Sequence, residues 1–389
     1  MRENVAAALF GGGVAWILYC YVGYPMVLLI LACFRRKRLV RDEAHAPHVS
    51  VLIAARNEER DIGWKIAETL AWDYPSDRVE ILVASDASND RTDEIVRECR
   101  DQRVRLVRLE KRGGKQRCLN RIVPEASGDI LFFTDANAHI GPACLKRMVR
   151  HFADGEVGCV TGVTRPLLTA KSAAIGNGAS VFLSFEGMLN SLESLIGSVM
   201  VCDGAIFCIR KGLFSPLTPT IANDLELPMR IRHSGFLNVY EAGGVVAEQD
   251  TSSLTEEFAR RRRISAQGMV GMWELRHTLT GLRGWQFVSH KLMRYLTLVP
   301  LVSMFAGTLG ATRTPFWNGL LVLQIVTYCL AIGVALLAAR GYAVGRLLSL
   351  PFYVLFGCIG AVMGIADWAR GKRYDIWETA TLSRGHAHG

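Results

Sequence analysis

The chain has 389 residues, which is enough for one large or two ordinary soluble domains. Half of the residues are apolar, a high share for a purely soluble protein, and the formal net charge is +9. The basic residues gather beside apolar stretches and in one arginine run, without interleaved aromatic residues, and the ten cysteines form no Cys-x-x-Cys pair. This composition argues against a nucleic-acid-binding protein, a disulfide scaffold and a zinc site.

The first predicted element is a transmembrane helix at residues 5–34, which carry no charge and are about as long as a bilayer requires. Arg35-Arg36-Lys37-Arg38 follow at once. A cleaved signal peptide has a shorter apolar core and a small-residue cleavage site, so an anchor is favoured. By the positive-inside rule, the domain that follows is expected in the cytoplasm, on the inner (plasma) membrane.

A membrane domain of two to three helices is predicted at the other end, over residues 295–368. Its apolar stretches are 295–311, 316–339 and 347–368. Three full spans would put Arg370, Lys372 and Arg373 outside, against the positive-inside rule. One stretch is therefore expected to lie at the interface or to re-enter, and the short first stretch is the weakest candidate for a full span. Together with the anchor, this predicts a multi-pass protein.

The segment between the predicted spans, residues 47–280, alternates short apolar runs with stretches of helical spacing. Strands and helices are predicted in the order β-α-β-α-β-α-β, at residues 49–54, 62–70, 79–85, 92–99, 104–107, 116–122 and 130–133. This order predicts an α/β domain with a doubly wound, mostly parallel sheet. Such sheets bind ligands outside the carboxyl ends of their strands, where the strand order reverses.

The central predicted strand, residues 130–133, is followed by two hard oxygen donors, Asp135 and Asn137. Four consecutive apolar residues favour a strand that is buried on both faces. A turn made of two ordinary turn formers is the simpler interpretation of this motif in isolation. Because such oxygens bind Mg²⁺ or Mn²⁺ together with phosphate, we predict a cation and a diphosphate at this strand end.

Polar residues also follow the other predicted strands. Those after the first strand include Arg56, Asn57 and Glu58. Asp86 directly follows the second strand, where a carboxylate can accept hydrogen bonds from a nucleobase or a ribose. After the third strand, the loop 111–115 can bring backbone N–H groups and the Lys115 ammonium onto a phosphate, although it lacks the Walker spacing.

Two further candidate motifs lie downstream. Asp203-Gly204 precedes a predicted strand at 206–209, and Gly204 either permits the close approach of a ligand or backbone or belongs to a plain turn. Asp224 begins an apparent helix that runs to His233. It is either an ordinary helix cap or a general base that faces the ligand crevice.

Two further helical patterns carry charge. Residues 185–194 predict a helix with an exposed acidic face. Residues 256–264 contain four consecutive arginines, 260–263, which point around most of a helix. At most two of them can face one ligand, and the others are expected to meet the membrane surface or solvent.

The ordered set of motifs between about residues 47 and 268 resembles the membrane-anchored, inverting glycosyltransferases of family 2. The resemblance implies a nucleotide-sugar-binding domain of the GT-A fold, inserted between N- and C-terminal transmembrane helices. It implies donor-binding roles for Arg56, Asn57, Glu58, Asp86, Lys115 and Asp135, and an acceptor-side turn at Asp203 and Gly204. It also implies a Mg²⁺ or Mn²⁺ site at Asp135 and Asn137, with Asp224 as catalytic base and Arg263 on the diphosphate.

Two departures from the family pattern bear on function. Asn137 replaces the second aspartate of the usual metal motif, and Ile264 replaces the tryptophan that follows the arginine in processive synthases. Without an aromatic platform for the acceptor sugar, few additions per encounter are expected. The resemblance therefore implies transfer from a nucleotide diphosphate sugar, UDP-linked by preference, to a lipid-linked or saccharide acceptor in exopolysaccharide or cell-envelope glycan synthesis.

Three alternatives remain at this point. The first alternative, within the same class, is a processive polysaccharide synthase. Outside it, a nucleotidyltransferase would share the sheet and an acidic metal site, but it would release pyrophosphate where a glycosyltransferase releases nucleoside diphosphate. A non-catalytic membrane subunit that only binds nucleotide is consistent with the altered metal motif and the missing tryptophan.

Overall fold

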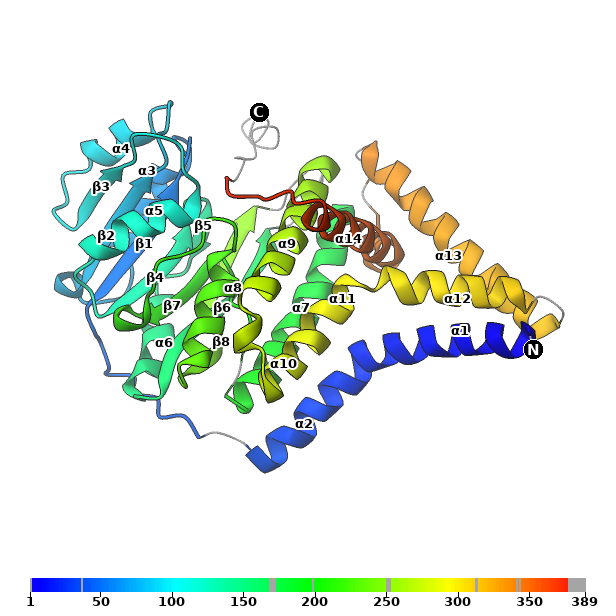
Figure 1. The fold of residues 1–389 in the computed structure, drawn as a ribbon. Coiled ribbons are helices and arrows are strands. Elements are labelled where there is room, and N and C mark those ends of the chain that lie inside the picture. Colours follow the sequence, from blue (N-terminus) through cyan, green and yellow to red (C-terminus); the bar gives the residue numbers. More distant parts are fainter. Residues whose placement is uncertain are drawn as a thin grey trace.

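A computed structural model describes residues 2–35, 38–167, 173–197, 199–249, 253–311, 314–340, 342 and 344–376. Two members of the predicted basic cluster, Arg36 and Lys37, lie outside the described residues. An α/β domain occupies one side of the molecule, and long helices from both ends of the chain gather on the other side (Figure 1).

Eight strands form one mixed sheet in the order β3-β2-β1-β4-β7-β6-β8-β5. They are β1 Val49–Ala55, β2 Val79–Ser85, β3 Val104–Arg108, β4 Ile130–Asp135, β5 Ala138–Ile140, β6 Val157–Leu167, β7 Ile206–Arg210 and β8 Leu237–Gln249. The first four are parallel, as expected from the βαβ pattern. The added half is mixed: β7 is antiparallel to β4 and β6, β8 is parallel to β6, and β5 is antiparallel to β8.

The core lies on both faces of the sheet, because alternate residues of each buried strand point to opposite faces. Ile53 and Phe132 face one side, which is covered by α3 Ile62–Leu70, α4 Thr92–Glu98 and α6 Cys144–Val149. Leu52 and Phe133 face the other side, which is covered by α5 Lys115–Ile122 and α8 Asn223–His233. The fully apolar runs of β1 and β4 are explained by this double burial.

Strands β6 and β8 were not predicted. Their register shifts between Thr161 and Val163. A Cβ atom on Gly162 would lie 1.7 Å from the carbonyl oxygen of Gly244, so the two backbones cross at a point where only glycine fits. The irregularity breaks the two-residue alternation by which a strand is recognised in a sequence.

The helix predicted at residues 185–194 is part of α7, Ala173–Leu195, but the expected exposure of its acidic face is wrong. Glu193 is fully buried. Its carboxylate accepts a hydrogen bond from the Tyr24 hydroxyl and contacts Nδ1 of His290 at 2.7 Å. The acidic side of α7 therefore joins the N-terminal apolar helix to the segment after the α/β domain.

Three described helices are long and apolar enough to cross a membrane: Glu3–Phe34, Pro315–Ala339 and Leu347–Ala369. The first consists of α1 Arg2–Leu18 and α2 Tyr24–Arg35, joined by a π-helical turn. The helix α12, Leu298–Gly310, is too short alone and bends by 58° from the preceding segment Gly281–Tyr295. It lies beside α1 (Figure 1), where a Cβ atom on Gly307 would lie 2.6 Å from the Ala6 carbonyl oxygen.

The last helix, α14 Arg346–Ala369, packs along α9, Leu254–Glu274, which carries the four arginines. Arg261 pairs with Glu257 and lies over the ring of Tyr353 on α14, with its guanidinium carbon 4.2 Å from the ring centroid. Arg262 donates two hydrogen bonds of 2.5 and 2.6 Å to Asp367, also on α14. The expectation that the spare arginines meet the membrane surface or solvent is therefore wrong for these two.

Candidate functional site

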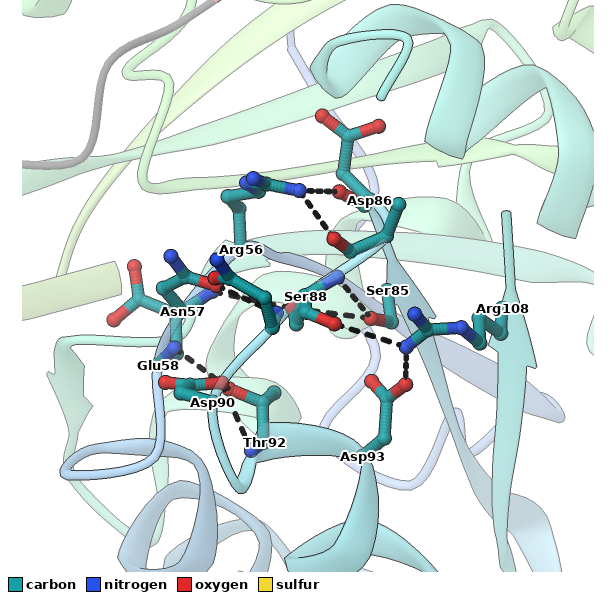
Figure 2. Close-up of polar contacts among 12 residues, drawn as sticks. Arg56, Asn57, Glu58, Ser85, Asp86, Ser88, Asp90, Thr92, Asp93 and Arg108 are labelled. Carbon is teal, nitrogen blue, oxygen red and sulfur yellow. Dashed lines mark hydrogen bonds and ion pairs between the residues drawn. The ribbon is translucent and has the colours of Figure 1, made fainter. Parts of the chain in front are cut away.

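The loops after β1 and β2 interlock at the carboxyl edge of the sheet (Figure 2). Arg56 Nη1 donates to the carbonyl oxygens of Asp86, at 2.6 Å, and Ala87. The backbone N–H of Asn57, a residue with φ 54°, donates to Ser88 Oγ, and that of Glu58 donates to Thr92 Oγ1. Arg56 and Asn57 thus brace the two loops against each other, and the structure brings the predicted donor-binding loops together.

Asp86 is almost fully buried at the end of β2. Its Oδ1 and Oδ2 accept hydrogen bonds from the backbone N–H groups of Gly113 and Gly114, at 2.6 and 3.0 Å. Gly114 has φ 88°, a left-handed conformation that favours glycine. Asp86 therefore holds the glycine loop, and any contact with a nucleobase has to use its remaining lone pairs.

The glycine loop opens α5, whose first residue, Lys115, reaches the end of β4. Its ammonium lies 2.5 Å from Asp135 Oδ1 and 3.4 Å from the Gly204 carbonyl oxygen. Burial by itself lowers the pKa of Lys115, but the surrounding carboxylates, Asp135 above all, together more than offset this effect and the net pKa is raised. Asp135 thus meets a cationic group of this chain at the position where a metal ion was predicted.

Glu248 is a further carboxylate at this point. In the antiparallel β5–β8 pairing, Glu248 lies opposite Ala138, which follows Asp135 by three residues. Burial, and next the Asp135 charge, raise the pKa of Glu248 to about 7. The described residues contain no group of three or more His, Cys, Asp or Glu side chains placed to hold a metal by themselves. A Mg²⁺ ion at Asp135 would therefore have to take most of its ligands from phosphate and water, which is the usual mode of this ion.

The acceptor-side turn lies on the other side of Lys115. Asp203 is fixed by Thr164, whose N–H and hydroxyl donate to its two carboxylate oxygens at 2.7 and 2.8 Å. A Cβ atom on the next residue, Gly204, would lie 3.0 Å from Asp224 Oδ2. The Cys202 N–H donates to the Asp224 carbonyl oxygen at 2.8 Å, which fixes the start of α8 against the turn. The neighbour of Gly204 is thus the Asp224 side chain, whereas the sequence predicted a ligand, a backbone segment or a plain turn there.

The surroundings of Asp224 act on its pKa in opposite directions. Burial raises its pKa, while the positive charges of Lys115 and Lys291 oppose the rise. Its side chain is not the N-cap of α8, because that position is Ala222. Lys291 comes from the π-helical turn Val288–Leu292 and was not singled out from the sequence, where it stands in a mostly apolar stretch.

Of the four arginines, Arg260 carries a half-exposed positive charge that opposes the rise in the pKa of Asp203 and of Glu248. Its pKa is raised first by Glu257 and also, against the effect of burial, by Glu248 and Asp203. Arg263, which the resemblance assigns to the diphosphate, lies three residues later on α9, so the two share a side of the helix. The sequence singled out the run but not which member faces the carboxylates.

The chain after α14 returns to the glycine loop. The Tyr374 carbonyl oxygen accepts a hydrogen bond of 2.8 Å from Gln267 Nε2 on α9, and the Tyr374 hydroxyl donates to Asp367. A Cβ atom on Gly114 would lie 2.1 Å from the Asp375 carbonyl oxygen. Residues 374–376 therefore lie against the loop that Asp86 holds.

Comparison with known proteins agrees with this arrangement. Residues 50–168 match the family model described as Glycosyl transferase family 2. The solved structure of the mannosyltransferase PcManGT from Pyrobaculum calidifontis, in complex with GDP-Man and Mn²⁺, aligns with a TM-score of 0.68. The alignment covers 93% of this chain and 99% of that one at 21% identity, which shows a shared GT-A fold.

Two curated relatives are similar in sequence. A β-monoglucosyldiacylglycerol synthase from Synechocystis is 27% identical over 73% of this chain and 62% of its own length. A poly-β-1,6-N-acetyl-D-glucosamine synthase from Staphylococcus epidermidis is 26% identical over 54% of this chain and 52% of its own length. The chain thus spans less than two thirds of the length of these relatives.

Proposed function

We propose that this chain, whose residues 50–168 match glycosyltransferase family 2, is a membrane-bound inverting glycosyltransferase. It moves a sugar from a nucleotide diphosphate sugar, UDP-linked by preference, to a lipid-linked or saccharide acceptor. The observation that carries the proposal is the double contact of Lys115. Its ammonium lies 2.5 Å from Asp135 Oδ1 and 3.4 Å from the Gly204 carbonyl oxygen, and a Cβ atom on Gly204 would lie 3.0 Å from Asp224 Oδ2. The donor and acceptor sides therefore meet at one side chain.

Inversion in a single displacement needs one base on the acceptor side and charge stabilisation on the leaving group. Asp224 takes the proton of the acceptor hydroxyl while that oxygen forms a bond to the anomeric carbon. The bond from this carbon to the diphosphate breaks, and the nucleoside diphosphate leaves with the electron pair. Lys115 and Arg263 stabilise its growing negative charge by charge-assisted hydrogen bonds.

A Mg²⁺ or Mn²⁺ ion held by Asp135 and Asn137 would add Lewis-acid stabilisation of the diphosphate when bound. The chain's own part is to arrange the donors. The end of β4 presents Asp135, the Asp86-held glycine loop presents Lys115, and the interlocked loops with Arg56, Asn57 and Glu58 form the nucleotide side. Asp203 and its Thr164 partner keep the acceptor-side turn in place.

A lipid acceptor is supported by the apolar helices that lie next to the candidate site. The segment Gly281–Tyr295 carries Lys291 toward Asp224, and the same segment leads into α12. One relative is named as a synthase of a glucosyl diacylglycerol, which also favours a lipid-linked acceptor. The second relative's name favours a saccharide acceptor, so both classes are kept in the proposal.

A cytoplasmic catalytic domain on a multi-pass protein is supported by the path of the chain's last described residues. Because residues 374–376 lie against Gly114, they are on the same side of the membrane as the α/β domain. An even number of crossings must then separate the two. The shortness of α12, Leu298–Gly310, favours this helix as the one that does not cross, with α13, Pro315–Ala339, and α14 as the two crossings.

The test is to incubate membranes that contain the chain with a panel of labelled nucleotide sugars and to follow labelled product and the released nucleotide. We expect incorporation from one donor class with release of free nucleoside diphosphate. Release of pyrophosphate would indicate a nucleotidyltransferase instead. Binding of a nucleotide sugar with no turnover on lipid or saccharide acceptors would indicate the non-catalytic subunit.

A further inference from the structure

Two acidic residues of α7, Glu186 and Glu193, hold the side chain of His290 between them. His290 Nδ1 lies 2.7 Å from Glu193 Oε1, and its Nε2 lies 3.0 Å from Glu186 Oε2. The imidazole is almost fully buried. An ionised carboxylate only accepts hydrogen bonds, so both ring nitrogens carry a proton and His290 is an imidazolium. The two glutamates are about two turns apart on α7, so they hold the histidine from one face of that helix.

The cluster around His290 is balanced in charge. Arg294 forms an ion pair with Glu186, and the Tyr24 hydroxyl donates a hydrogen bond of 2.5 Å to Glu193. Burial by itself raises the pKa of Glu186, but Arg294 and the other nearby cations more than offset this effect and the net pKa is lowered. Two carboxylates thus face two cations. Loss of one partner would leave a buried charge unpaired, so the cluster favours a single arrangement of the segments that it joins.

The π-helical turn that carries His290 also carries Lys291, and the two side chains leave it in different directions. Phe287, just before the turn, packs in the apolar cluster that contains Leu225, the residue after Asp224. Residues four apart lie on one side of a helix, so Lys291 follows Phe287 on the side toward α8. His290 lies roughly a quarter turn away, on the side of α7. The turn is therefore fastened to α7 by the histidine and presents the lysine toward α8.

The lysine side of the turn faces the proposed base. Burial raises the pKa of Asp224, and the charges of Lys115 and Lys291 oppose the rise. Lys115 also pairs with Asp135 at 2.5 Å, so its position is set from the end of β4. The position of Lys291 is set by the π-helical turn. The titratable groups around Asp224 are Lys115 of α5, Lys291, Tyr295 just after the turn, and Cys202 and Asp203 of the acceptor-side turn.

We propose that His290 is a positioning residue of the transfer site, which holds the π-helical turn against α7 and thereby keeps Lys291 beside Asp224. This role rests on the proposed function and deepens it, because it names what sets the surroundings of the base. Charge interactions weaken with distance, so a turn that moves away from α8 takes the lysine charge with it. Asp224 then keeps its proton to higher pH. His290 itself acts only through Lys291.

The test measures the protonation of Asp224 without turnover. A water-soluble carbodiimide with an added amine labels protonated carboxyl groups, and Asp224 is partly exposed. Mass spectrometry of peptides from the labelled full chain gives the pH at which labelling of Asp224 is half-maximal. Lys291→Met should raise this midpoint, and His290→Gln should raise it too. The double variant His290→Gln/Lys291→Met should show only the Lys291→Met shift, because the histidine acts through the lysine. Additive shifts would overturn the proposal, because the His290 charge would then act on Asp224 directly.

A compensated variant and a matched control separate positioning from folding. If His290→Gln elutes or melts differently from the unchanged chain, His290→Gln/Glu193→Gln takes its place, because it removes one positive and one negative charge together. The same rise in the midpoint is expected. The control is Ser289→Ala in the same turn, which loses the 2.7 Å contact of Ser289 Oγ with the Tyr19 hydroxyl and should leave the midpoint unchanged. An unchanged midpoint in the folded His290 variant, or an equal rise in Ser289→Ala, would overturn the proposal.

Sugar transfer is measured separately on the same preparations. The acid limb of kcat/KM should move with the labelling midpoint in each variant. If the unchanged chain transfers no sugar from any donor while His290→Gln still raises the midpoint, the proposed function fails and the positioning role stands. If the unchanged chain transfers sugar while the midpoint is the same in all His290 variants, the proposed function stands and the positioning role fails.

Discussion

Gly204 and Asp224 face each other so closely that a Cβ atom on Gly204 would lie 3.0 Å from Asp224 Oδ2. The two residues belong to different elements, the turn before β7 and the first turn of α8. Because the turn lacks a side chain at this position, the carboxylate can lie directly beside it. The Lys115 ammonium lies 3.4 Å from the carbonyl oxygen of the same Gly204, which places Asp224 near the Lys115–Asp135 pair.

The first prediction is that Asp224→Asn abolishes transfer and leaves nucleotide binding nearly intact, because the base acts on the acceptor. Loss of a general base typically costs about 10²–10⁴-fold in rate. Turnover and donor affinity are to be measured on the same preparation. Asp129→Asn, at an exposed position on the far edge of the domain, is the matched control and should be as active as the unchanged chain. A mutant that keeps more than about a tenth of normal turnover is too active for this role.

The second prediction concerns pH. Asp224 has to be ionised to accept a proton, and its pKa is raised above its ordinary value, so kcat/KM should fall as the pH falls through that pKa. Lys291 opposes the rise. Lys291→Met should therefore move the acid limb of the pH–rate profile to higher pH, and Lys291→Arg should leave it in place. If Lys291→Met lowers the plateau of kcat/KM without moving the acid limb, the role of Lys291 is structural.

The third prediction concerns the cation. Asp135 and Asn137 are hard oxygen donors, so transfer should require Mg²⁺ or Mn²⁺ and stop with chelator. Binding is to be followed separately, as the rise in melting temperature that Mn²⁺ causes in the presence of nucleoside diphosphate. Asp135→Ala should lose this rise. Full activity in excess chelator would remove the metal from the mechanism and leave the diphosphate to Lys115 and the arginines.

The fourth prediction follows from Glu248, whose pKa is raised to about 7 from an ordinary 4.5. The folded chain binds this proton more tightly than the unfolded chain. Its stability relative to Glu248→Gln should therefore be unchanged near pH 4.5 and should fall as the pH rises to about 7. Without divalent cation, Glu248→Gln should melt higher than the unchanged chain at about pH 8 and alike near pH 4.5. Glu98→Gln, at an exposed position, should show no such difference.

The fifth prediction concerns product length. Ile264 is 43% exposed and offers no aromatic face for a growing acceptor. Trp273 does not replace it, because it lies nine residues further along α9, roughly 13 Å away, with its ring centroid 6.4 Å from that of Trp368. We expect one sugar, or very few, per encounter when product is sized with donor in large excess. A ladder that reaches long polymer while most acceptor is untouched would show a processive enzyme.

The parallel half of the sheet could be predicted because its signals are local. The runs at β1, β2 and β4 are buried on both faces, and each is followed by a polar loop at the ligand edge. The metal motif, the glycine loop and Asp224 could be placed for the same reason, because each stands at the end of an element with a local signal. Their mutual distances were not predictable, because they depend on how the loops interlock, for example on Asp86 accepting from Gly113 and Gly114.

The rest of the site depends on long-range pairing. Glu248 reaches Asp135 only through the β5–β8 and β6–β8 pairings, and glycines at the crossing hide the strand pattern of β6 and β8. The prediction of an exposed Glu193 was wrong for a similar reason. A charged residue on a helix suggests a solvent-exposed face, but its partners Tyr24 and His290 come from distant parts of the sequence and bury it.

The pairing of α1 with α12 has a consequence for the order of events during synthesis. Ser303 Oγ donates a hydrogen bond to the Leu9 carbonyl oxygen across 294 positions of sequence. At about 5–20 residues per second, α1 leaves the ribosome roughly 15–60 s before its partner helix exists. In the proposed membrane placement, the small residues that later fit against α12, such as Ala6 and Gly13, face lipid or the insertion machinery during that interval. A larger residue at Gly13 should therefore leave insertion of the anchor intact and impair the later step in which the two ends of the chain close together, because its Cβ atom would lie 2.4 Å from Met304 Cγ.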